Sequence, residues 1–187
     1  ITHRLELAEV AQKYDAVLHD PEALGIIIQY PIPGGRDVLQ RNVSLKQDVL
    51  RDLRSDRGPE VNVGIIGAGT YARSILLPAL ARTRSHLVTV ADINGVAATH
   101  AGRKFGAEKA VSDYRLVLDD PEIQAVFILV AHHLHAQFVC EALKMGKHVF
   151  VEKPLALNDL ELNEIDALYT RLRSKSPGYP LLMVGFN

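Results

Sequence analysis

"VNVGIIGAGTYA", residues 61–72, places an apolar run with the character of a buried strand directly before a glycine-rich turn. The turn has the pattern G-x-G-x-x-A, and a helix is predicted to follow over about residues 70–82. Gly67 permits the tight turn out of the strand, and Gly69 lets the backbone approach a pyrophosphate. Ala72 is small enough for the helix to pack on the sheet, and the helix N-terminus offers free N–H groups to phosphates. The stretch predicts a dinucleotide-binding turn, with a purely structural glycine turn as the alternative.

The residues that follow supply an acid at the spacing this turn requires. A second apolar run, 86–92, ends in Asp92, 20 positions after Ala72, where a ribose-binding carboxylate is expected. Such a carboxylate accepts hydrogen bonds from the ribose hydroxyls and repels a 2′-phosphate. The next residues, Ile93 and Asn94, supply no Arg to neutralise a phosphate. The pattern favours NAD over NADP, and a turn or helix-cap role is the alternative for Asp92.

The rest of this region alternates between strands and helices. Strands are predicted at 61–67, 86–92, 109–111, 124–130, 148–152 and 179–186, and helices at 70–82, 94–104, 114–119, 133–145 and 158–173. The strands are continuous apolar runs, which is typical of a parallel sheet covered by helices on both faces. We therefore expect residues 60–187 to form a doubly wound α/β domain of the Rossmann type.

Ahead of this domain the pattern is different. Residues 5–18 have apolar side chains close to helical spacing, and residues 25–30 read as a strand. Residues 32–59 are polar and rich in Pro and Gly, which indicates a linker with a short helix or strand inside it. Residues 1–31 are therefore expected to form a helix-strand appendage.

Composition limits the possible partners. The 187 residues carry 21 Lys and Arg against 22 Asp and Glu, a net charge of −1, so neither nucleic acid nor a membrane surface is an expected partner. No apolar run approaches the roughly 18 residues of a membrane helix. One cysteine provides no disulfide framework, and a cytoplasmic location is the simplest reading. The chain begins without Met and closes on the apolar run "LLMVGFN", so we expect a fragment of a longer protein.

Three histidines follow the fourth predicted strand of this domain. His132, His133 and His135 lie where parallel sheets bind ligands. Their spacing is poor for a metal site, and the nearest carboxylate is Glu141. We predict no metal site, and we expect these histidines in a polar crevice, in contact with cofactor or solvent.

A last stretch, "GKHVFVEKPLA" at 146–156, ends a predicted strand in two charges and a proline. With "VGIIGAGTYA" and "MVGFN" it resembles the nucleotide-binding half of the Gfo/Idh/MocA oxidoreductase family, over about residues 60–187. The resemblance implies that Lys153 is catalytic and reaches the reacting hydroxyl or carbonyl of the substrate. It implies that Glu152 contacts the cofactor ribose or holds Lys153, and that Pro154 fixes the turn, often through a cis peptide.

The sequence departs from the family at one loop. Many members have Thr-Pro-Asn where this chain has Val130-Ala131-His132, whereas His135 matches a family histidine. The substitution leaves the nicotinamide contacts of this loop open. The complete set of predicted cofactor-binding residues is Gly67, Gly69, Thr70, Tyr71, Ala72, Asp92, Val130, His132, His135, Glu152, Lys153 and Pro154.

By resemblance, the reaction is hydride transfer between nicotinamide and a hydroxyl or carbonyl carbon of a sugar, sugar nucleotide or polyol. The family's acid–base histidine and substrate domain are expected beyond Asn187, so this chain alone is expected to be inactive. An oligomer is possible for the full-length protein. Two alternatives stay open, namely a non-catalytic nucleotide-binding sensor or scaffold and an S-adenosylmethionine-binding domain.

Residues 1–30 carry a second resemblance. "ITHRLELAEVAQKYDAVL" followed by "GIIIQYP" looks like the C-terminal end of a zinc-type medium-chain alcohol dehydrogenase. The resemblance implies an upstream dehydrogenase-like module fused to this domain. The alternative is an N-terminal extension that packs locally.

Overall fold

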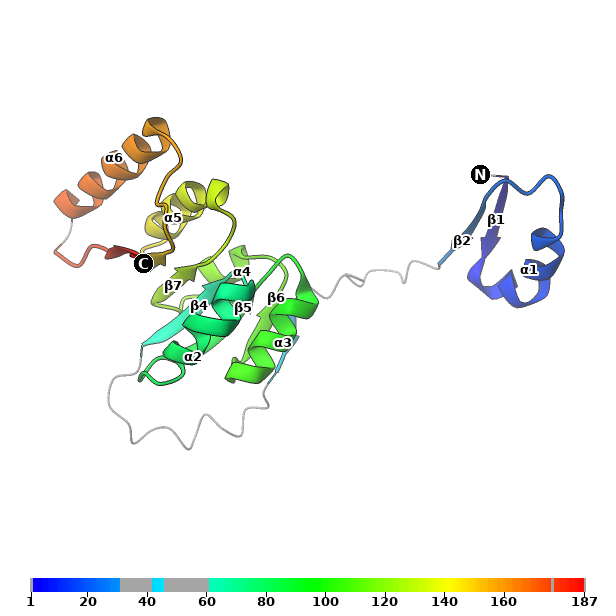
Figure 1. Ribbon diagram of the computed structural model, residues 1–187, viewed down its shortest axis with the longest axis horizontal. Helices are drawn as coiled ribbons and strands as arrows, with labels where there is room; N and C mark the ends of the chain where they lie inside the picture. The colour runs from blue at the N-terminus through cyan, green and yellow to red at the C-terminus, as the bar shows by residue number, and fades with distance from the viewer. Residues whose placement is uncertain (1, 31–41, 46–60, 176, 187) are drawn as a thin grey trace. The chain divides into compact units, whose positions relative to one another are not determined.

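The computed structural model describes residues 2–30, 42–45, 61–175 and 177–186. These residues belong to two compact units, Ile1–Gln40 and Arg41–Asn187 (Figure 1). Most of the linker predicted at 32–59 lies outside the described residues. Within it the structure describes residues 42–45, which include the short strand β3 (Asn42–Ser44).

The first unit is a small strand-helix-strand motif. It consists of β1 (His3–Glu6), η1 (Leu7–Glu9), α1 (Val10–Leu18) and β2 (Ile26–Gln29). The strand expected near 25–30 is confirmed, but the helix start expected at residue 5 is wrong. Residues 3–6 pair with β2 in parallel instead, and this pairing buries Leu5 to 4% exposure. The sheet partner outweighs the local helical periodicity of these residues.

The second unit is built on a seven-stranded sheet in the order β3-β6-β5-β4-β7-β8-β9. Its later strands are β4 (Asn62–Ile66), β5 (His86–Ala91), β6 (Lys109–Val111), β7 (Ala125–Ile128), β8 (His148–Val151) and β9 (Leu182–Val184). All pairs are parallel except β3 with β6. The chain runs from β4 outward to β6, then returns to β7 on the other side of β4. The predicted doubly wound parallel sheet is confirmed, and its switch point lies between β4 and β7.

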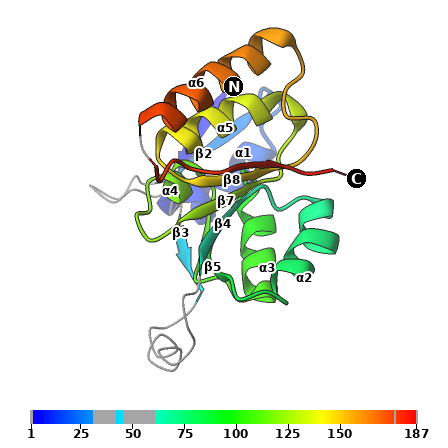
Figure 2. The same ribbon diagram turned by 90° about the vertical axis from the view of Figure 1, so that its left-hand side faces the viewer.

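Helices cover both faces of this sheet. The stretch η4 (Ala72–Leu76) with α2 (Leu77–Leu80), and α3 (Gly95–Phe105), lie on one face, whereas α5 (His135–Lys144) and α6 (Asp159–Lys175) lie on the other (Figure 2). The turn η5 (His132–Leu134) leads into α5, and the short helix α4 (Arg115–Leu118) follows β6. No helix among the residues that the structure describes has the length and apolar character needed to cross a membrane.

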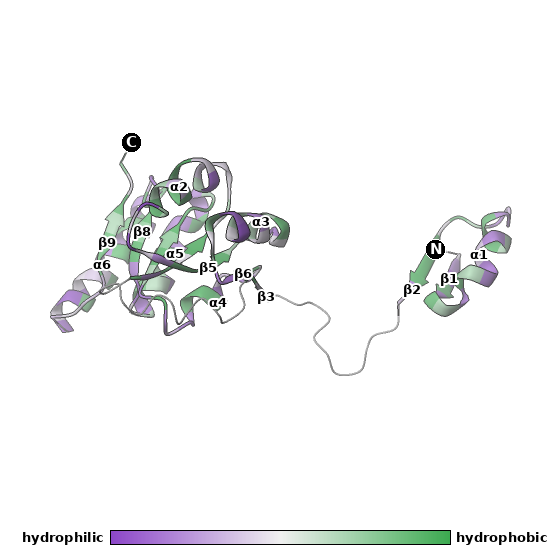
Figure 3. Ribbon diagram, turned by 90° about the horizontal axis from the view of Figure 1, so that it is seen from below, coloured by the Kyte–Doolittle hydropathy of each residue, from purple (hydrophilic) through white to green (hydrophobic). Residues whose placement is uncertain are grey.

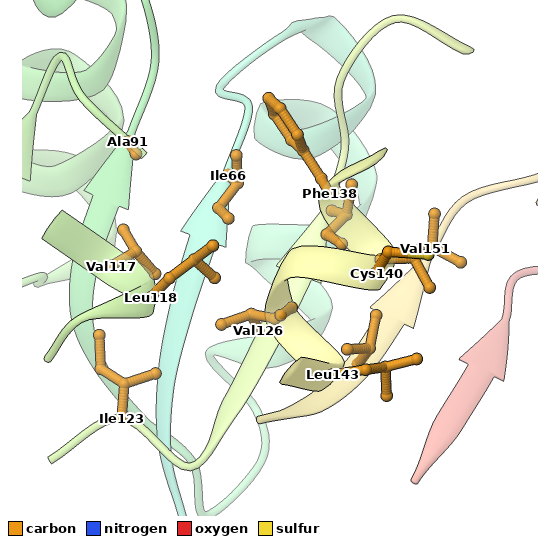
Figure 4. Packing of buried hydrophobic residues seen from close by; sticks show 14 of the residues in the cluster. Ile66, Ala91, Val117, Leu118, Ile123, Val126, Phe138, Cys140, Leu143 and Val151 are labelled. Carbon is orange, nitrogen blue, oxygen red and sulfur yellow. The ribbon is translucent and has the colours of Figure 1, made fainter. Parts of the chain in front are cut away.

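Each face has its own hydrophobic core, because successive side chains of β4 point to opposite faces. Ile65 packs with Leu77 and Ala98 beneath α2 and α3. Ile66 packs in the second core with Val126 and Leu143, as Figure 4 shows. The strands are coloured mainly as hydrophobic in Figure 3, as expected for a sheet covered on both sides.

Candidate functional site: the carboxyl edge of the sheet

The glycine turn after β4 lies at the switch point. Gly67 has φ +103°, and a Cβ there would lie 2.4 Å from the carbonyl oxygen of Leu129, so only glycine fits without strain. The Gly67 N–H donates to the carbonyl of Ala91 at 2.8 Å, which ties the turn to the end of β5. A Cβ on Gly69 would meet no atom within 4 Å. The turn is therefore fixed by contacts with the ends of β5 and β7, and the space beside Gly69 is open.

Asp92 is hydrogen-bonded to the same turn. Its Oδ2 accepts the Ala68 N–H at 2.7 Å, and its Oδ1 accepts the Asn94 N–H at 2.8 Å. The cap of α3 is Asn94, whose Oδ1 accepts the N–H groups of Val96 and Ala97. Asp92 is therefore a turn residue whose carboxylate, with one bond at each oxygen, is fixed at the carboxyl end of β5.

A cavity of about 650 Å³, the larger cavity, opens beside these two features. Its lining residues come from four strand ends: Ile66, Gly67, Gly69, Ala91, Asp92, Ile93, Ser112, Asp113, Tyr114, Arg115, Leu129, Val130, Ala131, Leu134 and Phe138. The volume is that of a small-molecule site. The segment from Ser112 to Arg115 was missed in the sequence. The signal was its position after the strand at 109–111, because parallel strands end at the same edge of the sheet.

Tyr114 forms one wall of the larger cavity. Its ring stacks on Phe138 with centroids 4.1 Å apart, and its hydroxyl donates to Glu141 Oε2 at 2.8 Å. Burial raises the pKa of the Tyr114 hydroxyl, and the hydrogen bond to Glu141 adds to the rise. The wall is therefore fixed by an aromatic stack and a charged acceptor.

A second cavity of about 240 Å³, the smaller cavity, lies on the other side of the switch point. Its lining residues are Tyr71, Leu129, Val130, His132, His135, Glu152 and Lys153. Leu129 and Val130 line both cavities, so the two share a wall. Predicted site residues thus lie along one edge, some in each cavity. Thr70, Ala72 and Pro154 line neither of them.

Glu152 and Lys153 line the smaller cavity, and Pro154 follows them in the chain. The peptide between Lys153 and Pro154 is cis. Glu152 Oε2 accepts the Lys153 N–H at 3.2 Å, whereas the buried Oε1 has no hydrogen-bond partner among the described residues. A Cβ on Gly185 would lie 2.9 Å from this Oε1, so glycine gives the carboxylate its room. A buried carboxylate oxygen without a partner is energetically costly.

His135 joins the two loops that bound the smaller cavity. Its ring is fully buried, with Nδ1 2.7 Å from the Pro154 carbonyl oxygen and Nε2 3.1 Å from that of Val130. A neutral imidazole donates from one nitrogen only, and a protonated ring donates from both. His135 therefore acts chiefly as a link between the loop after β7 and the loop after β8.

The neighbouring histidines form no metal centre with it. His132 is exposed and approaches the His135 ring edge-on, with centroids 5.5 Å apart. Across the described ranges, no three His, Cys, Asp or Glu side chains gather as metal ligands do. Of the three histidines, His132 and His135 line the smaller cavity, and His133 does not.

Residues 61–182 match the family model described as "Oxidoreductase family, NAD-binding Rossmann fold". The chain belongs to the Gfo/Idh/MocA family. Among curated relatives, the levoglucosan dehydrogenase of Pseudarthrobacter phenanthrenivorans is 34% identical, over 68% of this chain and 33% of that protein. The inositol 2-dehydrogenase of Gluconacetobacter diazotrophicus is 31% identical, over 68% of this chain and 37% of that protein.

Solved structures of Gfo/Idh/MocA proteins share the fold. A 3-ketoreductase from Actinomadura kijaniata, in complex with NADP and TDP-benzene, is 30% identical with a TM-score of 0.60, covering 68% of this chain and 37% of that one. A levoglucosan dehydrogenase in complex with NADH is 32% identical with a TM-score of 0.55, covering 60% and 32%. The chain spans about a third of the length of these relatives.

Proposed function

We propose that this chain is the NAD(H)-binding part of a dehydrogenase or reductase that acts on a sugar, a sugar nucleotide or a polyol. The observation that carries the proposal is the pair of cavities at the switch point, one beside Asp92 and the glycine turn, the other above Glu152 and Lys153. An extended dinucleotide needs this arrangement, with its pyrophosphate at the crossing between the two halves.

The residues present fit such a cofactor. The space at Gly69 accepts a pyrophosphate close to the backbone, and the Asp92 carboxylate keeps free lone pairs for ribose hydroxyls. At the other end, the Glu152 carboxyl group lines the smaller cavity, where it can accept a hydrogen bond from the second ribose. Thr70 opens the helix after the turn, and Ala72, 1% exposed, packs it on the sheet. When bound, the nicotinamide supplies the hydride donor or acceptor.

Lys153 is the catalytic residue of this proposal. Its side chain is exposed at the smaller cavity, and it makes no ion pair with a described residue. An ammonium beside a carbonyl oxygen stabilises the negative charge that develops when a hydride reaches the carbon, and it can pass a proton to that oxygen. In the reverse direction, it orients the hydroxyl group and stabilises the alkoxide.

The proposal extends to the full-length protein. We infer that a substrate domain, with the acid–base residue, lies outside this chain, since the match covers only about a third of each relative's length. Residues 1–31 would belong to an upstream dehydrogenase-like module, and the full-length protein is a candidate oligomer. A cytoplasmic location rests on the lone buried Cys140.

The test is calorimetric titration of this chain with NADH and, separately, with S-adenosylmethionine. We expect NADH to bind and S-adenosylmethionine not to bind. The variant Asp92→Asn keeps the shape of the side chain but loses a charged acceptor, so NADH binding should weaken about tenfold. Thermal unfolding with and without NADH provides a second readout, because a ligand that binds the folded state raises Tm.

The matched control is Asp119→Asn, which removes the same charge from an exposed carboxylate that lines neither cavity of the site. We expect NADH binding by this variant to equal that of the wild type. Binding of S-adenosylmethionine in place of NADH would overturn the proposal. So would an Asp92→Asn variant that binds NADH as the wild type does.

A further inference from the structure

A cation from the segment after a different strand lines the same cavity as Asp92. The Asp92 N–H donates to the carbonyl of Val111 at 3.1 Å, so the ends of β5 and β6 lie side by side. Arg115, four positions after Val111, begins α4 and lines the larger cavity together with Asp92. The sequence around Asp92 offers no Arg, and the neighbouring strand supplies one.

The two charges differ in how firmly they are held. Both carboxylate oxygens of Asp92 are bonded to backbone N–H groups, so this side chain cannot turn away from the cavity. Arg115 has a side chain that is 65% exposed, and its nearest carboxylate, on Asp113, is 3.9 Å away. An exposed pair at this distance contributes little. The guanidinium is therefore free to turn toward a stronger anionic partner.

The Arg115 guanidinium lies over the ring of Tyr114. Its guanidinium carbon lies 5.1 Å from the centre of the Tyr114 ring, and that ring is fixed by Phe138 and Glu141. Arg115 is the one Lys or Arg among the described residues that line the larger cavity. A guanidinium binds phosphate through two parallel hydrogen bonds, which a neutral or more distant group cannot supply.

We propose that Arg115 binds the 2′-phosphate of NADPH, so that this chain accepts NADPH as well as NADH. The inference deepens the proposed function and rests on it. Asp92 repels a 2′-phosphate, and Arg115 offsets the repulsion from the other side of the same cavity. Family membership does not decide the cofactor, because one solved relative was crystallised with NADP and another with NADH.

The test compares NADH and NADPH binding by calorimetry in wild type, Arg115→Ala and Arg103→Ala. Arg103 is exposed in the last turn of α3 and lines neither cavity, so its variant loses the same charge elsewhere. We expect Arg115→Ala to weaken NADPH binding about tenfold or more and NADH binding less than about threefold. Arg103→Ala should change neither affinity.

Salt dependence gives an independent readout. NADPH affinity should fall more steeply with added NaCl in wild type than in Arg115→Ala, because one phosphate contact is missing in the variant. NADH binding without any NADPH binding in wild type would overturn this inference and leave the proposed function intact. Equal weakening of both cofactors in Arg115→Ala would also overturn it. Failure of the wild type to bind either cofactor would overturn both.

Discussion

The larger and the smaller cavity share the wall formed by Leu129 and Val130, but they are built differently. Around the larger cavity, Asp92 bonds the glycine turn and Tyr114 bonds Glu141. Around the smaller cavity a buried oxygen of Glu152 has no described partner, and Lys153 projects from a cis peptide. Asp92 and Tyr114 at the larger cavity are therefore held in place by hydrogen bonds, whereas Glu152 at the smaller cavity keeps one oxygen without a described partner.

This contrast separates binding from chemistry. Substitutions around the larger cavity should change cofactor affinity. Lys153, in the smaller cavity, should affect turnover and leave affinity and stability nearly unchanged. Substitutions in the wall between the cavities should change both cofactor affinity and turnover, because the glycine turn and the loop after β7 meet there.

The largest effect is expected for Lys153→Ala in the full-length protein. Removing the ammonium should lower turnover about 10²- to 10⁴-fold, the range for a positioned proton-transfer group. NADH affinity should change less than about threefold, since the role that we propose for Lys153 is at the substrate oxygen. Steady-state rates together with NADH titration measure both quantities. A Lys153→Ala enzyme with near-normal turnover would remove this residue from the chemistry.

Gly67→Ala should destabilise the fold by about 2–4 kcal/mol, since a Cβ would strain a positive φ and press on the Leu129 carbonyl. Urea unfolding measures the change. Gly95→Ala is the control, because a Cβ there meets no atom within 4 Å. Its free energy of unfolding should stay within about 1 kcal/mol of wild type. Equal stability of the two variants would contradict the packing described at the switch point.

His135→Ala should cost about 2–3 kcal/mol of unfolding free energy, because it removes a buried ring and leaves at least one carbonyl group without its donor. The control His133→Ala changes an exposed ring and should stay within about 0.5 kcal/mol. Chemical denaturation of both variants is the measurement. If His135→Ala were as stable as His133→Ala, the link between the two loops would not contribute.

Tyr114→Phe should have the smallest effect, about 1 kcal/mol or less, because the stack on Phe138 remains and one hydrogen bond is lost. A folded-state pKa above the unfolded one stabilises the fold below about pH 10 and loses that contribution as pH rises through the folded pKa. Unfolding free energy should therefore fall less between pH 9 and 11 in the variant than in wild type. Parallel pH profiles of the two proteins would argue against a raised pKa for Tyr114 in the folded state.

Much of the fold follows from local patterns in the sequence. Continuous apolar runs predicted the parallel strands, and the glycine turn with Asp92 predicted the strand-turn-helix unit that begins the domain. The start of α1 did not follow, because residues 3–6 gain a partner strand about 20 residues away. The antiparallel pairing of β3 with β6 also depends on a distant segment. Strand pairing across such separations leaves no mark in local periodicity.

The site was predictable to the extent that its residues carry local motifs. Gly67 and Asp92 do so, and the Glu-Lys-Pro stretch carried the family resemblance. Arg115 lies on the next strand end, so its place beside Asp92 appears only once the order of β5 and β6 is known. His135 was expected against the cofactor or solvent. Its full burial between two carbonyl groups follows from three-dimensional packing that its spacing cannot reveal.

We propose that a dinucleotide lies across the switch point with its pyrophosphate against Gly69. Titration of the chain with NADH, beside Gly69→Ala and Gly95→Ala, tests it most directly. Neither added Cβ meets a protein atom within 4 Å, so both variants should fold, and circular dichroism checks this. We expect wild type and Gly95→Ala to bind NADH with equal affinity. In Gly69→Ala, NADH binding should be weakened at least about tenfold. Equal NADH binding by all three would contradict it.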